Sequence, residues 1–325
     1  MAESKDDVID PEGMVAKYSV VRALGILGDT WTILILRAAF YGTHRFSDWQ
    51  NDLGIPKAVL SSRLERLVEN RILYKRPIQN GGRRMEYLLD EAGLELWEPL
   101  AAMVGWSHQW YRPEGPQDAK FRHRTCGCDC DLILSCDICA TPLTFYDTYA
   151  EEGPGAGLEP RIEAHSRRRA NSAIRHGEAV LGSAEALTLF GDLWAPAIVA
   201  AAFRGGQRFN DLVTYLRIPP LVLSMRIKEL LAMDVLTRRT VEGSEHYEAF
   251  HLTRKGLDLF PYVSMMAKWG DRWRGDASGV PLVFQHRHCG HNYKPHFRCS
   301  VCNGRVHRAD IEFLNLGPVR QADQS

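Results

Sequence analysis

The residues best suited to bind a metal ion gather in two short stretches of the chain. All eight cysteines fall within residues 126–139 or 289–302. In a reducing compartment, cysteines packed this closely favour metal ligation over disulfide formation. The sequence therefore predicts one metal site in each stretch.

Within each stretch the candidate ligands come in pairs with two residues between them. A His-x-x-Cys pair comes first and a Cys-x-x-Cys pair follows. Each pair bends back as a tight knuckle that presents both donors to one ion, and two knuckles complete a tetrahedral site. Four filled positions leave none for a catalytic water, so the expected ion is a structural Zn²⁺. The predicted ligands are His123, Cys126, Cys136 and Cys139 in the first stretch, and His286, Cys289, Cys299 and Cys302 in the second.

Two cysteines of the first stretch lie outside this pattern. Cys128 and Cys130 have no cysteine counterpart in the second stretch. They could replace His123 as ligands or form a redox-labile edge to the site. The alternative to metal binding is a pair of redox disulfides, Cys136–Cys139 and Cys299–Cys302.

The two stretches belong to an internal repeat. An offset of 163 residues maps Trp31 onto Trp194, and the same offset maps Cys126 onto Cys289 with no insertion between them. Duplication explains such agreement, and the period is far longer than that of a solenoid, so each copy should be a complete domain. The joint at residues 151–157 is rich in glycine and predicts a flexible linker.

The first half of each copy shows the apolar spacing of helices. Residues 20–40 predict two helices, the second capped by Asp29 or Thr30. A short helix over 46–53, with its N-cap near Arg45, precedes a break at Gly54-Ile55-Pro56. A further helix over 57–70 completes a helix-turn-helix and would be the recognition helix.

The second half of each copy predicts a wing. Two short strands over 73–78 and 85–89 flank Asn80-Gly81-Gly82, a strong hairpin signal. Asp90 then caps a final helix from residue 91 to about 110. Helices followed by a two-stranded wing and a last helix define a winged helix.

The expected fold is mainly α with small β wings: two winged helix-turn-helix domains, each followed by a small zinc-ribbon-like knuckle. The expected boundaries are an acidic tail at 1–15, winged helices at 16–112 and 179–275, knuckles at 121–145 and 284–308, a linker at 146–178, and a tail at 309–325.

The residues of each winged helix resemble the HxlR branch of the MarR-type regulators. The resemblance lies in Arg22-Ala23-Leu24, Gly28-x-x-Trp31-Thr32, Arg45-Phe46-Ser47, Leu60-Ser61-x-Arg63-Leu64, and Glu86-Tyr87 before Asp90-x-x-Gly93. It implies a transcription factor that acts on two operator half-sites, usually as a homodimer. Many members carry a redox-sensing cysteine where this chain has Tyr18 and, in the second copy, Leu181. That departure argues against the same sensing mechanism.

The two copies differ in the charge of the predicted DNA-binding surface. Residues 57–84 hold eight cations and two acids, a net charge of +6, whereas the matching span 220–247 holds four of each. DNA binding needs cations that displace counterions from phosphates. We therefore expect the first copy to supply most of the DNA affinity. The second copy would support the first, mediate dimerisation or dock elsewhere.

Candidate DNA contacts follow from the outward faces of the recognition helices and the wing. Arg63 and Arg226 lie at the helix flank, where a structural ion pair is the alternative to a base contact. The predicted contacts are Lys57, Ser61, Ser62, Arg63, Arg66, Arg83, Arg84, Ser224, Arg226 and Lys228. The basic stretch 161–175 is either a solvated helix or an arm that contacts phosphates.

Composition narrows the class of protein. The formal net charge is zero, which argues against a general nucleic-acid coating protein. No apolar run approaches the roughly 18 residues of a membrane span, and the polar start is unlike a secretory signal, so we expect a cytoplasmic protein. No nucleophile–base pair or phosphate loop emerges, so we expect no enzyme.

The expected partner is double-stranded DNA, bound by one chain across two half-sites or by a homodimer, and no pattern indicates a particular small-molecule effector. The alternative function is a zinc-stabilised adaptor that binds other proteins of the transcription machinery. The neutral charge of the second copy is compatible with this role.

Overall fold

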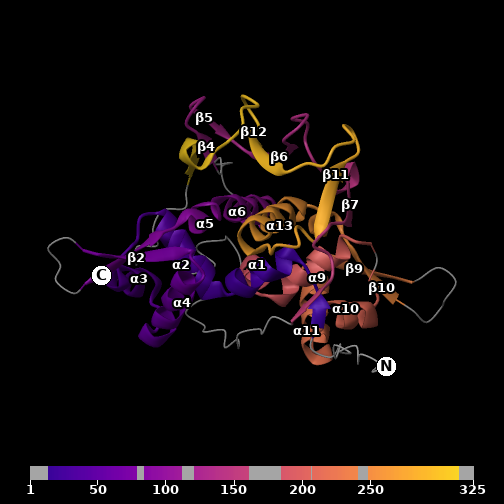
Figure 1. The fold of residues 1–325 in the computed structure, drawn as a ribbon, viewed down its shortest axis with the longest axis horizontal. Helices are drawn as coiled ribbons and strands as arrows, with labels where there is room; N and C mark the ends of the chain where they lie inside the picture. Colours follow the sequence, from indigo (N-terminus) through magenta and orange to yellow (C-terminus); the bar gives the residue numbers. More distant parts are fainter. Residues whose placement is uncertain are drawn as a thin grey trace, which may run out of the picture.

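The computed structural model of the protein describes residues 14–78, 84–111, 121–160, 184–205, 207–240 and 248–314. Two helical units lie side by side, and a layer of short strands covers both of them on one face (Figure 1). No helix within these ranges is both long and apolar enough to cross a membrane.

The first helical unit has the order expected of a winged helix. Its elements are α1 (Ser19–Leu27), α2 (Thr30–Phe40), α3 (Phe46–Leu53), α4 (Lys57–Glu69), β2 (Leu73–Pro77), β3 (Met85–Leu89), α5 (Glu91–Leu94) and α6 (Trp97–Trp110). The second unit repeats it with α8 (Ala184–Phe190), α9 (Trp194–Ala202), α10 (Phe209–Leu216), α11 (Pro220–Ala232), β9 (Leu236–Thr240), β10 (Glu248–Leu252), α12 (Arg254–Leu257) and α13 (Phe260–Arg274).

Local sequence explains most of these boundaries. Asp29 is the N-cap of α2 and accepts a hydrogen bond from the Thr32 amide at 2.9 Å, as predicted. Gly54 adopts a left-handed conformation after α3, and Pro56 directly precedes α4. The final predicted helix is interrupted between α5 and α6 instead of running unbroken. Pro99 explains the break, because it has no amide to donate to the carbonyl of residue 95.

The two copies pack against each other about a pseudo-twofold axis. The indole of Trp106 donates to the Lys255 carbonyl at 2.9 Å, and the equivalent Trp269 donates to the Ala92 carbonyl at 2.8 Å. Asp29 forms an isolated β-bridge with Asp192, its own counterpart in the repeat. Equivalent residues that meet in this way lie on the axis, so the copies are arranged as the two halves of a symmetric dimer would be.

The strand layer is built by exchange between the copies. Its elements are β4 (Phe121–His123), β5 (Cys128–Cys130), β6 (Leu132–Cys136), β7 (Thr148–Glu152), β11 (Leu282–His286), β12 (Pro295–Cys299) and β13 (Ile311–Phe313). Each copy's strands find partners in the other copy: β6 pairs with β12, β4 with β13 and β7 with β11, all antiparallel. The expectation of one separate knuckle after each winged helix is therefore wrong: both stretches share one interleaved unit.

The predicted linker also contains ordered strands. β7 reaches into it and pairs with β11, and β8 (Leu158–Pro160) pairs with β1 (Met14–Ala16). The glycines serve close packing here, because the Gly153 amide donates to the Pro281 carbonyl at 2.9 Å and a Cβ at this position would overlap the Val280 carbonyl. The basic stretch 161–175 lies outside the described residues.

Substitution of Gly270 tests the packing between copies. A Cβ at Gly270 in α13 would overlap the Ser19 carbonyl of α1, whereas a Cβ at Gly105 in α6 meets nothing within 4 Å. We expect Gly270→Ala to lower the free energy of unfolding in urea by about 1–3 kcal/mol. Gly105→Ala is the control and should raise it by up to about 1 kcal/mol, because alanine favours a helix. Equal stability of the two variants would contradict this packing.

Candidate nucleic-acid interface and metal centres

Two clusters of cysteine and histidine lie in the strand layer, and each takes ligands from both copies. In each cluster the four side chains offer ligand atoms that all lie within 4.8 Å of one another. The first cluster is His123, Cys126, Cys299 and Cys302, and the second is Cys136, Cys139, His286 and Cys289. Both clusters could hold a metal ion.

The distances within the clusters fit a tetrahedral ion. Cys126 Sγ lies 3.9 Å from Cys299 Sγ and 3.4 Å from His123 Nδ1. Cysteine sulfurs about 2.3 Å and a histidine nitrogen about 2.0 Å from an ion would be separated by about 3.8 Å (S–S) and about 3.5 Å (S–N). In the second cluster the same pairs, Cys136–Cys289 and Cys289–His286, are separated by 3.9 and 3.4 Å.

Backbone amides turn toward the sulfurs. The amides of Ile138 and Val301 donate to Cys136 Sγ and Cys299 Sγ, each at 3.4 Å. Such bonds stabilise thiolates and fix their direction, as expected of groups around a metal site.

The grouping of ligands corrects the sequence prediction. The same eight residues were expected to form one site within each copy, but each His-x-x-Cys pair faces the Cys-x-x-Cys pair of the other copy. The register of β6 with β12 causes this, because it sets Cys136 opposite Pro295 and Cys299 opposite Leu132. The C-terminal end of each strand therefore lies next to the His-x-x-Cys pair of the other copy.

The extra cysteines lie beside the first cluster without joining it. His123, and not Cys128, is in the cluster, while the Cys128 thiol points to the Cys126 carbonyl at 3.5 Å. Cys130 is buried, and this burial, with the neighbouring Cys299, raises the pKa of its thiol to about 12. The disulfide alternative finds no support, because all eight cysteines are free thiols in the structure.

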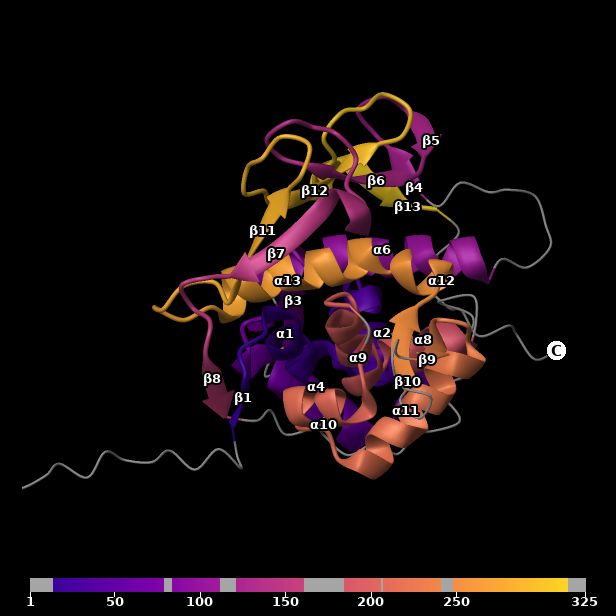
Figure 2. The same cartoon turned by 90° about the vertical axis from the view of Figure 1, so that its right-hand side faces the viewer.

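The recognition helices lie on the face opposite the cysteine–histidine clusters. In both views α4 and α11 are at one side of the molecule and the strand layer with β4, β6 and β12 is at the other (Figures 1 and 2). The β2–β3 and β9–β10 hairpins extend at the two ends of the long axis (Figure 1). A duplex could therefore contact both helices without meeting the clusters.

Arg63 is held in a structural ion pair. Its Nε and one terminal nitrogen each donate to the Asp29 carboxylate at 2.9 Å. Burial opposes ionisation of Asp29, but the hydrogen bonds and charge of Arg63 lower its pKa on balance. In the second copy Arg226 Nε lies 2.6 Å from the equivalent Asp192. Both arginines thus tie a recognition helix to the N-terminal end of α2 or α9, near the pseudo-twofold axis.

The other predicted contacts of α4 fall into two groups. Arg66 turns inward and donates to the carbonyls of Gly25 and Ile26, the latter at 2.9 Å. Ser61 is half-buried and donates to Glu65 at 3.3 Å. Lys57 and Ser62 are exposed, and so is Arg84 at the base of the wing. Arg83 lies outside the described residues.

The exposed face of α11 is apolar where that of α4 is polar. Leu221 and Met225, the counterparts of Ala58 and Ser62, are 74% and 46% exposed. Ser224 and Lys228 are exposed on the same helix. Sequence reasoning missed the acidic partners of the two arginines, although Asp29 and Asp192 at the repeat offset were a signal for them.

Comparison with known proteins places the chain in a family. A family model described as HxlR-like helix-turn-helix matches residues 26–115 and again 189–278, more than half of the chain. The chain belongs to this family, and it is a DNA-binding transcriptional regulator with its module duplicated. The family is one of regulators, which agrees with the expectation of no enzyme.

Several known proteins are similar to part of this chain. An uncharacterized HTH-type transcriptional regulator of Mycobacterium tuberculosis is 43% identical over 138 residues, which are 42% of this chain and 87% of the relative. The HTH-type regulator YvaP of Bacillus subtilis is 30% identical over 27% of this chain and 83% of its own length. The solved structure of PA1607 is 32% identical over 33% of this chain and 74% of its own, with a TM-score of 0.30.

Paired cysteine substitutions test the grouping of ligands. Cys126→Ser with Cys299→Ser removes two ligands from one observed cluster, so we expect one chelator-resistant metal ion per chain to remain. Cys126→Ser with Cys136→Ser removes one ligand from each cluster and should weaken both. Metal content after dialysis against a chelator measures the difference. If instead Cys126→Ser with Cys136→Ser keeps one ion and Cys126→Ser with Cys299→Ser loses both, the ligands are grouped within each copy.

Substitution of Arg63 tests its structural role. We expect Arg63→Ala and Asp29→Asn each to lower the free energy of unfolding by about 1–3 kcal/mol, because each leaves a partly buried partner unsatisfied. The free energy that the double variant loses should not exceed the sum of the two single losses, because both substitutions remove the same interaction. The salt dependence of DNA binding should stay unchanged in Arg63→Ala. A loss of salt dependence would show that Arg63 contacts phosphate.

Proposed function

We propose that the chain reads operator DNA mainly through its first winged-helix copy. The observation that carries this is the contrast between equivalent exposed positions, Ala58 and Ser62 on α4 against Leu221 and Met225 on α11. A serine and an alanine can approach base edges and a thymine methyl group, whereas the large apolar side chains cannot hydrogen-bond to base edges.

Exposed cations support the same assignment. Lys57 at the start of α4, Lys75 on β2 and Arg84 beside β3 are exposed. Phosphate contacts from such side chains position a recognition helix and supply most of the salt-dependent affinity. In the second copy Arg238 lies 3.6 Å from Glu248, which offsets part of its charge.

We also propose that each cluster holds a structural Zn²⁺ ion. Three thiols and one imidazole in a closed tetrahedral arrangement are a donor set that suits zinc. Because each cluster draws ligands from both copies, a bound ion would fasten the two copies to each other. The metal would thus stabilise the relative position of the two recognition helices.

The chain supplies two winged helices by itself, so we propose that one chain acts where related regulators would need a dimer. The pseudo-twofold contacts of Trp106 and Trp269 support this. Covalent linkage keeps the second module at a high effective concentration. A cytoplasmic location is part of the same proposal, since the partner is genomic DNA.

One observation favours a second role for the other copy. Leu221 and Met225 form an exposed apolar strip on α11, of the kind that marks protein contacts. The second copy could therefore act as an adaptor toward another protein of the transcription machinery, and capture that survives DNA removal would favour this role.

A salt titration of operator binding tests the division of labour. We expect Lys57→Ala with Arg84→Ala to reduce the slope of log affinity against log salt by about 2, about one for each lost phosphate contact. Lys228→Ala with Arg239→Ala removes one helix cation and one wing cation from the second copy and should change the slope little. An operator can be found by selection from genomic fragments. Equal losses in both variants would overturn the asymmetry.

A further inference from the structure

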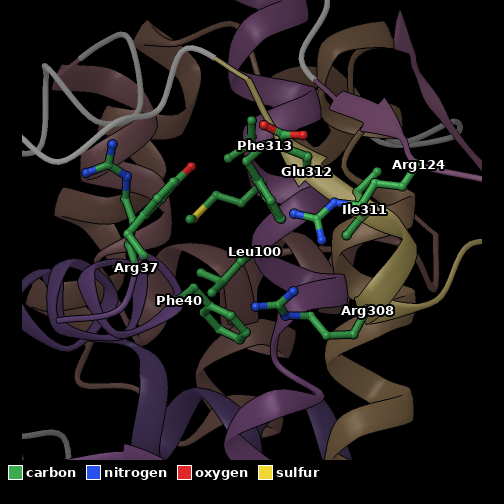
Figure 3. Close-up of a pocket in the computed structure, with 11 residues that line it drawn as sticks. Arg37, Phe40, Leu100, Arg124, Arg308, Ile311, Glu312 and Phe313 are labelled. Atoms are coloured by element: carbon green, nitrogen blue, oxygen red, sulfur yellow. The ribbon is translucent and has the colours of Figure 1, made fainter. Parts of the chain in front are cut away.

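A cavity lies where the first winged helix meets the strand layer. Its volume is about 340 Å³, within the range of small-molecule sites. One wall comes from α2 and α6, and the other comes from the segment 308–313 of the second copy together with Arg124 (Figure 3). The apolar side chains that line it are Phe40, Leu100, Met103, Val104, Ile311 and Phe313.

Two arginines bring positive charge to this apolar space. Figure 3 shows Arg308 reaching toward Phe40 and Leu100, and its guanidinium carbon lies 5.2 Å from the Phe40 ring centre. Arg308 Nε is buried without a hydrogen-bond partner among the described residues. Burial, together with the neighbouring Arg124, lowers the pKa of the Arg308 guanidinium. The cavity thus holds a half-buried guanidinium, whose Nε is buried and unpartnered, beside a second, exposed cation.

The acidic side chain at the cavity does not balance this charge. Glu312 also lines the space, but it is exposed. Among the described residues, the ion pairs of the structure do not join Glu312 to either arginine. Arg37 on α2 adds a third cation to the wall and lies over the Tyr41 ring at 5.2 Å. The lining therefore carries more positive than negative charge.

The second copy lacks this arrangement. At the repeat offset Phe145 stands in the place of Arg308, and Phe203 in the place of Phe40. The Phe145 ring centre lies 5.3 Å from that of Phe203 and 6.4 Å from that of Phe260. An aromatic ring therefore packs where the first copy has a guanidinium group. The site is specific to one half of the duplicated molecule.

We propose that this cavity binds a small organic anion with an aromatic or aliphatic body and a carboxylate headgroup. Arginine pairs with carboxylates through two parallel hydrogen bonds, and a bound carboxylate would satisfy the buried Arg308 Nε or its terminal nitrogens. The apolar wall from Phe40, Leu100 and Met103 would cover the body of the ligand. A small inorganic anion would leave that wall without contacts.

The position of the cavity couples it to DNA recognition, and this part of the inference rests on the proposed function. α2 carries Arg37 at the cavity and Asp29 at its N-cap, and Asp29 holds Arg63 of the recognition helix α4. A ligand against α2 therefore touches the helix that orients α4. Occupancy changes DNA affinity to the extent that the two states of α2 bind the ligand differently.

Calorimetric titration of the full, metal-loaded chain with 2-naphthoate tests the site. We expect one ligand per chain, with 2-naphthamide binding at least about tenfold more weakly because it lacks the charge. Arg308→Phe copies the second half and fills the cavity, so it should abolish binding. Arg124→Ala should weaken binding about tenfold or more, while the matched control Arg287→Ala, at the equivalent position of the second copy, should not change it.

Each outcome decides a separate point. Equal affinity of Arg124→Ala and the wild-type chain, two sites per chain, or equal binding of the amide would overturn the anion site. Melting temperature and metal content confirm that Arg308→Phe is folded, and Arg124→Ala keeps the test valid if it is not. Operator affinity at saturating 2-naphthoate tests the coupling alone. If the ligand does not change operator affinity, the proposed coupling is wrong, whereas ligand binding and DNA binding are each unaffected by that result.

Discussion

The packing of the two copies about a pseudo-twofold axis is the constraint on which the rest of the molecule depends. Two indole hydrogen bonds at equivalent positions, from Trp106 and Trp269, and the bridge between Asp29 and Asp192 fix this arrangement. It places both recognition helices on one face and the strand layer, which contains both cysteine–histidine clusters, on the other. Each cluster then needs both copies, so the cysteine–histidine clusters and the dimer-like interface depend on the same relative position of the copies.

Covalent fusion has a further consequence. In a homodimer every substitution appears at two symmetric places, but in a duplicated chain each half can change alone. The two halves have kept the contacts on the axis, including the ion pairs of Arg63 and Arg226. They have diverged on the exposed face of the recognition helix and at the cavity beside α2, as Ser62 against Met225 and Arg308 against Phe145 illustrate. The two halves therefore share one fold but present different surface residues.

A single residue connects these parts. Asp29 caps α2, meets its counterpart on the axis and holds Arg63 of α4. The orientation of the recognition helix is therefore set by the interface between copies and not only by the core of its own domain. The cavity that we propose for an organic anion lies along the same helix α2, which gives a ligand there a short physical path to the DNA-binding face.

The sequence by itself determined the local structure and the types of ligand. The N-cap at Asp29, the break at Gly54-Ile55-Pro56 and the knuckle spacing each depend on residues that are close along the chain. Only the tertiary structure decided which knuckles share a cluster. At a fixed offset of 163 residues, a pairing within a copy and a pairing between copies use identical residue types and spacings. The antiparallel register of β6 with β12 selects between them, because it brings Cys299 to Cys126 and Cys136 to Cys289.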